Sequence, residues 1–379
     1  MRRFIVEVGV AGVLALSSAA QAQSRGFIVR LGNDTIAIER FERSGDRIEG
    51  TILRRIPQTN FFKYSIRLNS DGSVATYEQS VLRADGSRSP LAPMPLKIAF
   101  IGDSVIRDVM RNNEPVNLRA AAPKGTLPAM GGSWLGSELL VQAVKRGGQV
   151  HTIGVNAQQA APVPVTVRLI GSDSAEIVSG GFRTGLKLDQ NGQVVRGDGS
   201  LTTQKFIATP ETSADLSAIA AAWAAKDAAG QSMGVASTRD TVTATVAGAN
   251  IWIDYGRPAK RGRAIWGALV PYDTTWRLGA NAATQFRTDK DLDVGGVTVP
   301  AGSYTLWLYP TATQSFLIVN AQTGQWGTAY DASKDLVRVP LDPHMSLPSS
   351  EERFRIFVQG DMLMLHWDRG GYGVKIKAK

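Results

Sequence analysis

The sequence contains no cysteine and only three histidines among its 379 residues. The absence of cysteine excludes disulfide bonds, thiol catalysis, iron–sulfur clusters and zinc sites with cysteine ligands. So few histidines make a histidine-rich metal site unexpected. A P-loop, a dinucleotide-binding fingerprint and a βαβ alternation are also missing from the sequence. We therefore predict neither a metal nor a cofactor.

Neither positive nor negative residues are clustered in any part of the sequence. Lys and Arg number 42 against 33 Asp and Glu, which gives a formal net charge of +9. This excess is spread thinly, and no block of five like charges occurs, so a nucleic-acid-binding tail is not indicated. A mildly basic protein of this kind is compatible with a location near anionic lipid or polysaccharide.

The first 22 residues have the three-part pattern of a signal peptide. Arg2 and Arg3 precede an apolar run over residues 8–16, and Ala20-Gln21-Ala22 fits the A-x-A cleavage pattern. The apolar run is too short to span a bilayer as a permanent helix, and no cysteine at the cleavage point could carry a lipid anchor. The alternative is a buried N-terminal helix. We expect an exported protein, periplasmic or extracellular, with no transmembrane segment in a mature chain that starts at Gln23.

Hydrophobic residues recur with a period of two from Phe27 onward, and polar turn signals such as Gly32-Asn33-Asp34 separate the short runs. This pattern is typical of paired antiparallel strands. Residues 23–210 are therefore predicted to form a β-rich N-terminal domain, an antiparallel meander or partly closed barrel. Within it, residues 112–135 are rich in Pro, Gly, Ala and Asn and are interpreted as a loop.

One segment between the two β-patterned regions has helical spacing. In residues 212–230, Thr212 or Ser213 can cap a helix that Gly230 ends, and its apolar positions are Leu216, Ile219, Ala220 and Trp223. We interpret residues 211–236 as a connector helix and linker, with the helix packed by Leu216 and Trp223. A membrane-surface helix is the alternative, but the segment has few cations.

Short strand patterns return after Ser237 and continue to the C-terminus. About nine of them in residues 237–379, with almost no helix, favour a β-sandwich or jelly roll. The predicted fold class is therefore all-β, with the signal peptide at residues 1–22 and two β domains at 23–210 and 237–379.

Gly102-Asp103-Ser104 follows an apolar run and resembles the nucleophile block of the SGNH/GDSL hydrolases, in which Ser104 would be the nucleophile. The family's other blocks are out of order or incomplete, because Gly32-Asn33-Asp34 precedes the serine and Asp342-Pro343-His344 is one residue too short. In a meander, Gly102-Asp103 is a hairpin turn, which we predict here. A serine hydrolase that uses Ser104 is kept as the alternative function.

Three alternating aspartates, Asp289, Asp291 and Asp293, could suggest a calcium loop. The glycine and the terminal glutamate of an EF-hand are absent. We predict a solvated turn that leads into a strand, and no metal site.

The segment from Asp254 to Thr284 carries several separated motifs: Asp254-Tyr255-Gly256-Arg257-Pro258, then Leu269-Val270-Pro271-Tyr272, then Trp276-Arg277-Leu278-Gly279-Ala280-Asn281. Pro300-Ala301-Gly302-Ser303-Tyr304, Asn320 and Gln325-Trp326-Gly327 follow in the same order as in one family. In these motifs the region of about 237–379 resembles domain of unknown function 2911. The resemblance implies an exported β-sandwich-like domain, and it implies no activity, substrate or cofactor. Residues 23–236 resemble the β-rich half found beside this domain in some exported proteins.

Cations, tryptophans and an asparagine gather in these motifs. Arginine clamps carboxylates, phosphates or sulfates, and tryptophan stacks on sugars or on arginine. We hypothesise one pocket for an anionic small molecule or a glycan, lined by Arg257, Lys260, Arg263, Trp276, Arg277 and Asn281. The structural alternative, which we favour slightly, pairs Arg257 with Asp254 or Asp273 and uses Trp266 and Trp276 as core plugs.

The predicted function is therefore non-catalytic. The protein is expected to bind a ligand or to have a structural role in the cell envelope. Carriage of an apolar ligand by a curved N-terminal sheet is a further possibility that the period-two pattern leaves open.

Overall fold

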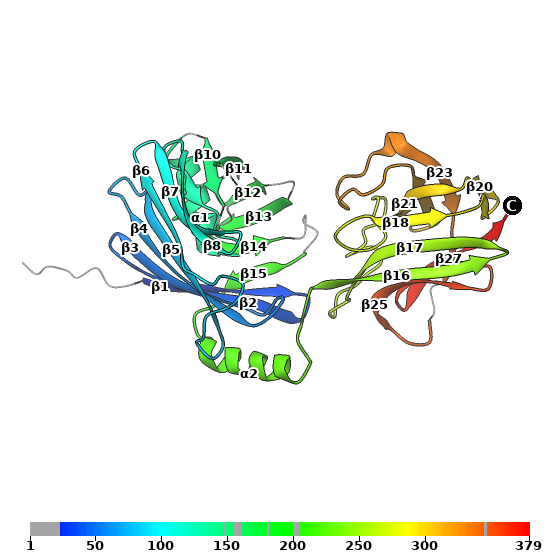
Figure 1. Cartoon of the computed structure of the whole chain (residues 1–379), viewed down its shortest axis with the longest axis horizontal. Helices are drawn as coiled ribbons and strands as arrows, with labels where there is room; N and C mark the ends of the chain where they lie inside the picture. Colours follow the sequence, from blue (N-terminus) through cyan, green and yellow to red (C-terminus); the bar gives the residue numbers. More distant parts are fainter. Residues whose placement is uncertain are drawn as a thin grey trace, which may run out of the picture.

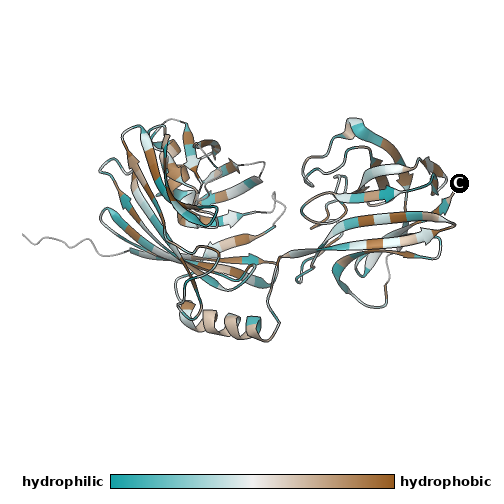
Figure 2. Ribbon diagram, viewed as in Figure 1, coloured by the Kyte–Doolittle hydropathy of each residue, from teal (hydrophilic) through white to brown (hydrophobic). Residues whose placement is uncertain are grey.

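Apolar and polar residues alternate along many strands, as the hydropathy colouring in Figure 2 shows. Successive side chains of a strand point to opposite faces, so this alternation favours one buried and one exposed face. The computed structural model describes residues 23–147, 149–154, 159, 161–179, 182–199, 205–344 and 347–379. The predicted signal peptide lies outside these residues. The prediction of a mostly β chain is confirmed, and two α-helices accompany the strands (Figure 1).

Fifteen strands form one sheet in the N-terminal half, in the order β8-β7-β6-β5-β4-β3-β2-β1-β15-β14-β13-β12-β11-β10-β9. Strands β9 and β10 are parallel, and the other neighbours are antiparallel. The sheet does not close into a barrel. Its strands are β1 (Gln23–Leu31), β2 (Asp34–Ser44), β3 (Arg47–Arg54), β4 (Asn60–Leu68), β5 (Val74–Arg83), β6 (Leu96–Ile101), β7 (Ser104–Arg111), β8 (Glu114–Ala121), β9 (Leu127–Pro128), β10 (Val150–Ile153), β11 (Val163–Ile170), β12 (Ser174–Ser179), β13 (Phe182–Leu188), β14 (Val194–Asp198) and β15 (Ile207–Pro210).

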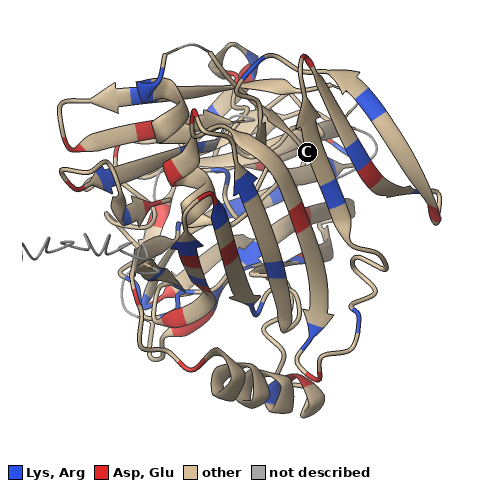
Figure 3. Cartoon of the chain, turned by 90° about the vertical axis from the view of Figure 1, so that its left-hand side faces the viewer, with Lys and Arg blue, Asp and Glu red and all other residues tan. Residues whose placement is uncertain are grey.

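Cations and anions are mixed along the strands of this sheet. In Figure 3, Lys and Arg are interspersed with Asp and Glu over the strands that face the viewer. Several of them pair, as Arg168 and Arg183 do with Glu176. Surface pairs of this kind contribute little each, so the mixed charges mainly keep the strand faces solvated.

The prediction of a loop over residues 112–135 is wrong. This segment contains β8, β9 and the first residues of α1 (Trp134–Lys145). Strand β8 ends the sheet, and no residue of it is fully buried. A strand in that position needs few apolar residues and tolerates Pro115, so its sequence lacks the usual signal.

Helix α1 lies inside the curve of the 15-stranded sheet (Figure 1) and shares its core. Ser133 caps it, because the Ser133 hydroxyl accepts a hydrogen bond from the Gly136 N–H group (2.9 Å). Trp134, Leu135, Leu139 and Val141 are buried against the strands. The sheet and helix thus enclose one continuous apolar core.

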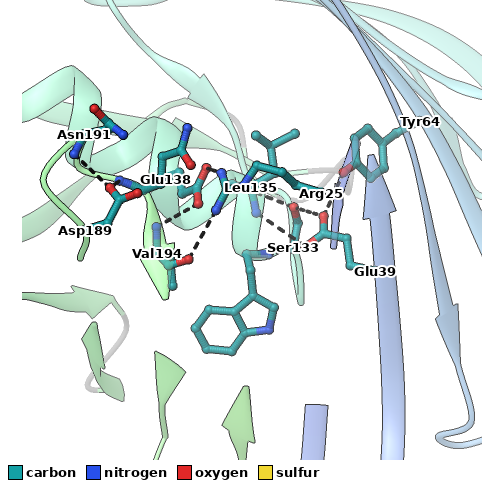
Figure 4. A network of polar contacts seen from close by, with 12 residues as sticks. Arg25, Glu39, Tyr64, Ser133, Leu135, Glu138, Asp189, Asn191 and Val194 are labelled. Carbon is teal, nitrogen blue, oxygen red and sulfur yellow. Dashed lines mark hydrogen bonds and ion pairs between the residues drawn. The ribbon is translucent and has the colours of Figure 1, made fainter. Parts of the chain in front are cut away.

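Buried Glu39 on β2 joins the start of α1 to the sheet (Figure 4). One carboxylate oxygen accepts hydrogen bonds from the hydroxyls of Tyr64 (2.7 Å) and Ser133 (2.5 Å). The other accepts them from the backbone N–H groups of Trp134 (2.6 Å) and Leu135 (3.4 Å). Burial raises the pKa of this carboxyl, and the four hydrogen bonds oppose that rise. Glu39 therefore satisfies the unpaired donors at the helix N-terminus.

Helix α2 (Leu216–Ala228) is the predicted connector, and Leu216, Ala220 and Trp223 pack it against Leu53 and its neighbours. The predicted cap is wrong. The side chain of Asp215 accepts from the N–H groups of Ser217 and Ala218, whereas the Ser213 hydroxyl donates to Glu211. Thr212, Ser213 and Asp215 are all residue types that can cap a helix, and the sequence alone does not choose among them.

Two antiparallel sheets of the C-terminal half share a second core. One contains β16 (Ser237–Val246), β17 (Ala249–Pro258), β18 (Thr284–Thr288), β21 (Gly302–Tyr309), β22 (Phe316–Asn320) and β23 (Asp335–Pro340). The other contains β20 (Val297–Val299), β19 (Leu292–Val294), β27 (Gly370–Ala378), β26 (Met362–Asp368) and β25 (Glu351–Gln359), with β24 (Asp342–His344) paired to β27. Neither described helix combines the length and apolarity that a membrane crossing requires.

The role of Glu39 predicts different effects for two substitutions. Glu39→Ala leaves the helix N–H groups and two hydroxyls unpaired, so the free energy of unfolding should fall by about 3 kcal/mol or more. Glu39→Gln should cost only about 1 kcal/mol, because the amide oxygen still accepts from α1 and both hydroxyls can turn to accept from the amide nitrogen. Urea unfolding measures both values. Equal losses of unfolding free energy in the two variants would show that the charge of Glu39, rather than its acceptor oxygens, holds the helix.

Candidate functional site: a pocket between the two halves

The two halves meet where the turn between β1 and β2 contacts the turn after β17. The Asn33 N–H group donates to the Arg261 carbonyl oxygen (2.9 Å), and the Arg261 guanidinium forms an ion pair with Asp34. Gly32 has a positive φ of 62°, and a Cβ there would lie 2.2 Å from the Arg261 carbonyl oxygen. We call this contact between residues 32–34 and 261–262 the junction. It needs glycine at position 32 both for the turn and for the close approach.

A pocket of about 560 Å³ lies beside the junction. Its volume falls within the range of natural small-molecule sites. The N-terminal half contributes ends of the first three strands and the start of α1, and the C-terminal half contributes the loops between β17 and β18. Neither half alone could form the pocket.

The charge of this pocket is of one sign. Arg54, Lys205, Arg261, Arg263 and Arg277 line it, and none of its described lining residues is Asp or Glu. Arg261 is neutralised in the junction by Asp34. The described lining therefore carries positive charge without a lining carboxylate, and positive charge attracts anions.

Arg277 is partly buried and has no counterion among the described residues. Among the described residues its guanidinium forms neither an ion pair nor a hydrogen bond, and its Nε is buried without an acceptor. Burial lowers the pKa of Arg277 to about 10. An unpaired buried charge is costly, so the folded protein must offset this cost elsewhere.

Lys205 and Arg263 lie close enough to Arg277 to form one cationic cluster. Burial lowers the pKa of Lys205, and the neighbouring charges of Arg277 and Arg263 lower it further. Arg263 uses two of its N–H groups on the carbonyl oxygens of Lys260 (2.9 Å) and Ala259 (2.6 Å). Its position is therefore fixed, and it forms no ion pair among the described residues, although the charges of Glu352 and Asp34 act on it.

Arg54 stands apart from this cluster. Its guanidinium lies 5.0 Å from the centre of the Phe62 ring, and burial lowers its pKa. It makes no ion pair among the described residues. The pocket therefore has a cationic cluster and one separate cation.

Close backbone approaches hold the loop that carries Arg277. A Cβ at Gly256 would lie 2.1 Å from the Ala280 carbonyl oxygen, and a Cβ at Gly327 would lie 1.9 Å from Arg277 Cδ. Leu278 and Asn281 have positive φ values of 51° and 63°. Strained backbone of this kind occurs preferentially at functional sites.

These glycines and the arginine belong to the separated motifs of the sequence, and comparison with known families matches the same region. Residues 237–376 match the model of a family described as "Protein of unknown function (DUF2911)". This part of the chain is a DUF2911 domain. The resemblance inferred from the motifs is therefore confirmed.

Solved structures give only distant likenesses. A DUF1089 family protein from Pseudomonas aeruginosa is 12% identical, with a TM-score of 0.30 over 43% of this chain and 89% of its own. A β-barrel-like protein of DUF1849 from Brucella abortus is 10% identical, with a TM-score of 0.31 over 50% of this chain and 95% of its own. None of the curated protein sequences compared with the chain matches it.

Four of the six predicted site residues of the DUF2911 domain line the pocket: Arg263, Trp276, Arg277 and Asn281. Trp276 is also buried in the core, where its ring stacks on Trp367 with centres 5.9 Å apart. Trp266 packs edge-on against Tyr372. The binding role and the core role proposed for Trp276 are thus compatible.

Arg257 and Lys260 are not among the residues lining the pocket. Arg257 pairs with Asp240 on β16 (3.1 Å), and Lys260 pairs with Asp368 (2.6 Å). The expectation that Arg257 would pair with Asp254 or Asp273 is wrong, because Asp254 pairs with Arg239. The register of β16 against β17 decides these partners, and the motif does not specify it.

Sequence reasoning missed the contribution of the N-terminal half. Arg54, Trp134, Lys205 and Phe206 line the pocket, although they come from three separate segments. Only the junction brings them to the DUF2911 domain. No local motif could have indicated them.

Ser104 lies outside this pocket, at the start of β7. Gly102 and Asp103 form the two-residue turn of the β6–β7 hairpin, as predicted. The Ser104 hydroxyl accepts a hydrogen bond from Arg119 (3.3 Å). The described residues show no hydrogen bond between Ser104 and a histidine.

The described residues contain no group of three or more carboxylates or histidines arranged to hold a metal ion. Asp289, Asp291 and Asp293 instead accept backbone N–H groups from Asn250, Ala301 and Gly296. These aspartates stabilise turns around the strands, in line with their interpretation as turn residues.

The junction can be tested with two glycine substitutions that strain the backbone equally. Gly32→Ala places a Cβ against Arg261. Gly45→Ala is the control: it lies in the next hairpin turn, it has a φ of 60°, and its added Cβ would have no atom within 4 Å. Both should cost about 1 kcal/mol of backbone strain. Only Gly32→Ala should separate the halves, which small-angle X-ray scattering would detect as a larger radius of gyration. A radius unchanged from the native protein would contradict the role of the junction.

Proposed function

We propose that the protein is an exported binding protein that holds a small organic anion in the pocket beside the junction. The observation that carries this proposal is the partly buried Arg277 guanidinium, which has no counterion in the part of the chain that the structure describes. A ligand carboxylate, phosphate or sulfate would supply the missing charge and accept its N–H groups. The signal-peptide pattern of the first 22 residues supports export.

Binding fits the lining residues better than bond cleavage does. Arginine stays protonated near neutral pH and is a poor general base, but its planar guanidinium recognises oxyanions well. The aromatic residues Trp134 and Trp276 supply flat apolar surface. An anion is favoured over a neutral glycan, because a neutral ligand would leave the cationic cluster uncompensated.

The proposal predicts opposite behaviour for two arginines of the DUF2911 domain. Arg277→Met removes an uncompensated buried charge, so the free protein should gain about 1 kcal/mol of stability while its anion affinity falls about tenfold or more. Arg257→Met removes the pair with Asp240, so it should lower stability by about 1 kcal/mol and leave anion binding unchanged.

Calorimetric titration with phosphate, benzoate, galacturonate and decanoate, together with thermal melts, measures both effects. The native protein should bind at least one of these anions, and the Arg257→Met variant should bind it equally well. The proposal is wrong if no anion binds the native protein, or if Arg277→Met binds as tightly as the native chain does.

A further inference from the structure

Apolar residues form most of the pocket wall. The N-terminal half contributes Leu31, Ile36, Trp134 and Phe206, and the DUF2911 domain contributes Trp276 and Trp367. Trp134 and Phe206 contact each other edge-on with ring centres 5.9 Å apart, and Trp276 stacks on Trp367. The pocket therefore offers an aromatic pair from each half. A small hydrophilic anion would leave this apolar lining without an apolar partner.

The positive charge is localised rather than spread around this wall. Arg277, Arg263 and Lys205 all line the same pocket, where the charges of both arginines and the opposite charge of Asp198 act on the Lys205 ammonium. We call these three cations one cluster. Arg54 stacks on Phe62 and belongs to no such group. One cluster beside a long apolar wall matches a molecule with one acidic end and a hydrocarbon remainder.

We propose that the ligand is a linear amphiphile with a single acidic headgroup. The headgroup binds Arg277 and Arg263, and the hydrocarbon chain lies along Ile36 and the aromatic pairs. This inference rests on the proposed function, since it names the chemical class of the anion that the pocket takes. Carboxylate and phosphate heads share the chemistry that arginine recognises, so both are tested.

The alternatives each leave part of the pocket unsatisfied. A short hydrophilic anion would neutralise the cluster but leave the wall in contact with water. An uncharged lipid would cover the wall but bury the Arg277 charge without a partner. A cationic amphiphile would be repelled by the cluster.

The experiment titrates the full mature chain with straight-chain carboxylates from butanoate to decanoate, below their micelle concentrations. Each added methylene group that leaves water contributes enough to strengthen binding about threefold to fourfold. Affinity should therefore rise steadily along the series until the pocket is filled. Decyl phosphate should bind comparably to decanoate, and decyltrimethylammonium should not bind.

Two isoleucine variants localise the hydrocarbon chain. Ile36 is half-buried in the pocket wall, whereas Ile101 is 59% exposed at the β6–β7 turn, outside the pocket. Ile36→Thr should weaken decanoate binding about fivefold or more and leave butanoate binding unchanged. Ile101→Thr should change neither decanoate binding nor butanoate binding, so it serves as the control for the isoleucine-to-threonine change.

The outcomes separate this inference from the proposed function. If butanoate or galacturonate binds as tightly as decanoate does, and Arg277→Met abolishes this binding, the amphiphile is wrong and anion binding stands. If decyltrimethylammonium binds as well as decanoate, binding is non-specific adsorption and the inference is overturned. If no anion of any length binds, both the amphiphile inference and the proposed anion-binding function are wrong.

Discussion

The junction determines where every other part of the candidate site lies. Gly32 allows the β1–β2 turn to approach the Arg261 backbone, and the Asp34–Arg261 ion pair fixes that approach. The pocket walls come from both halves, so their separation depends on this one contact. The ion pair also removes a fifth positive charge that would otherwise repel the cationic cluster. The junction thus sets both the shape and the charge of the pocket.

Each half contains one energetically unfavourable feature. In the N-terminal half, Glu39 is buried at a cost, but it satisfies the start of α1, and the helix in turn fills the curve of the sheet. In the DUF2911 domain the cost lies in the Arg277 loop, where the backbone of Leu278 and Asn281 has positive φ. The first cost is offset by four hydrogen bonds within the protein. Hydrogen bonds from Thr284 and Gly327 also hold the Leu278 and Asn281 carbonyl groups, but the Arg277 guanidinium has no ion pair or hydrogen bond among the described residues, which is why a ligand is its natural partner.

Period-two alternation predicted the mostly β chain, and motif order predicted the DUF2911 domain, because both signals are local in sequence. Edge strand β8 escaped prediction because a strand with one neighbour needs little apolar surface. The cap at Asp215 was missed because neighbouring residues compete for that position. Arg263 and Arg277 could be proposed from their loops, whereas Arg54 and Lys205 could not. Their place in the pocket depends on how two distant segments meet at the junction, and no periodicity encodes that.

Arg257 and Arg277 show why composition alone could not define the site. Both lie in DUF2911 motifs that also contain a glycine and an aromatic residue. Arg257 leaves β17 next to β16, where Asp240 meets it across the sheet. Arg277 emerges from a strained loop toward the N-terminal half, whose contribution to the described pocket wall contains no carboxylate. A counterion within reach makes an arginine structural, and the lack of one leaves its charge available to a ligand.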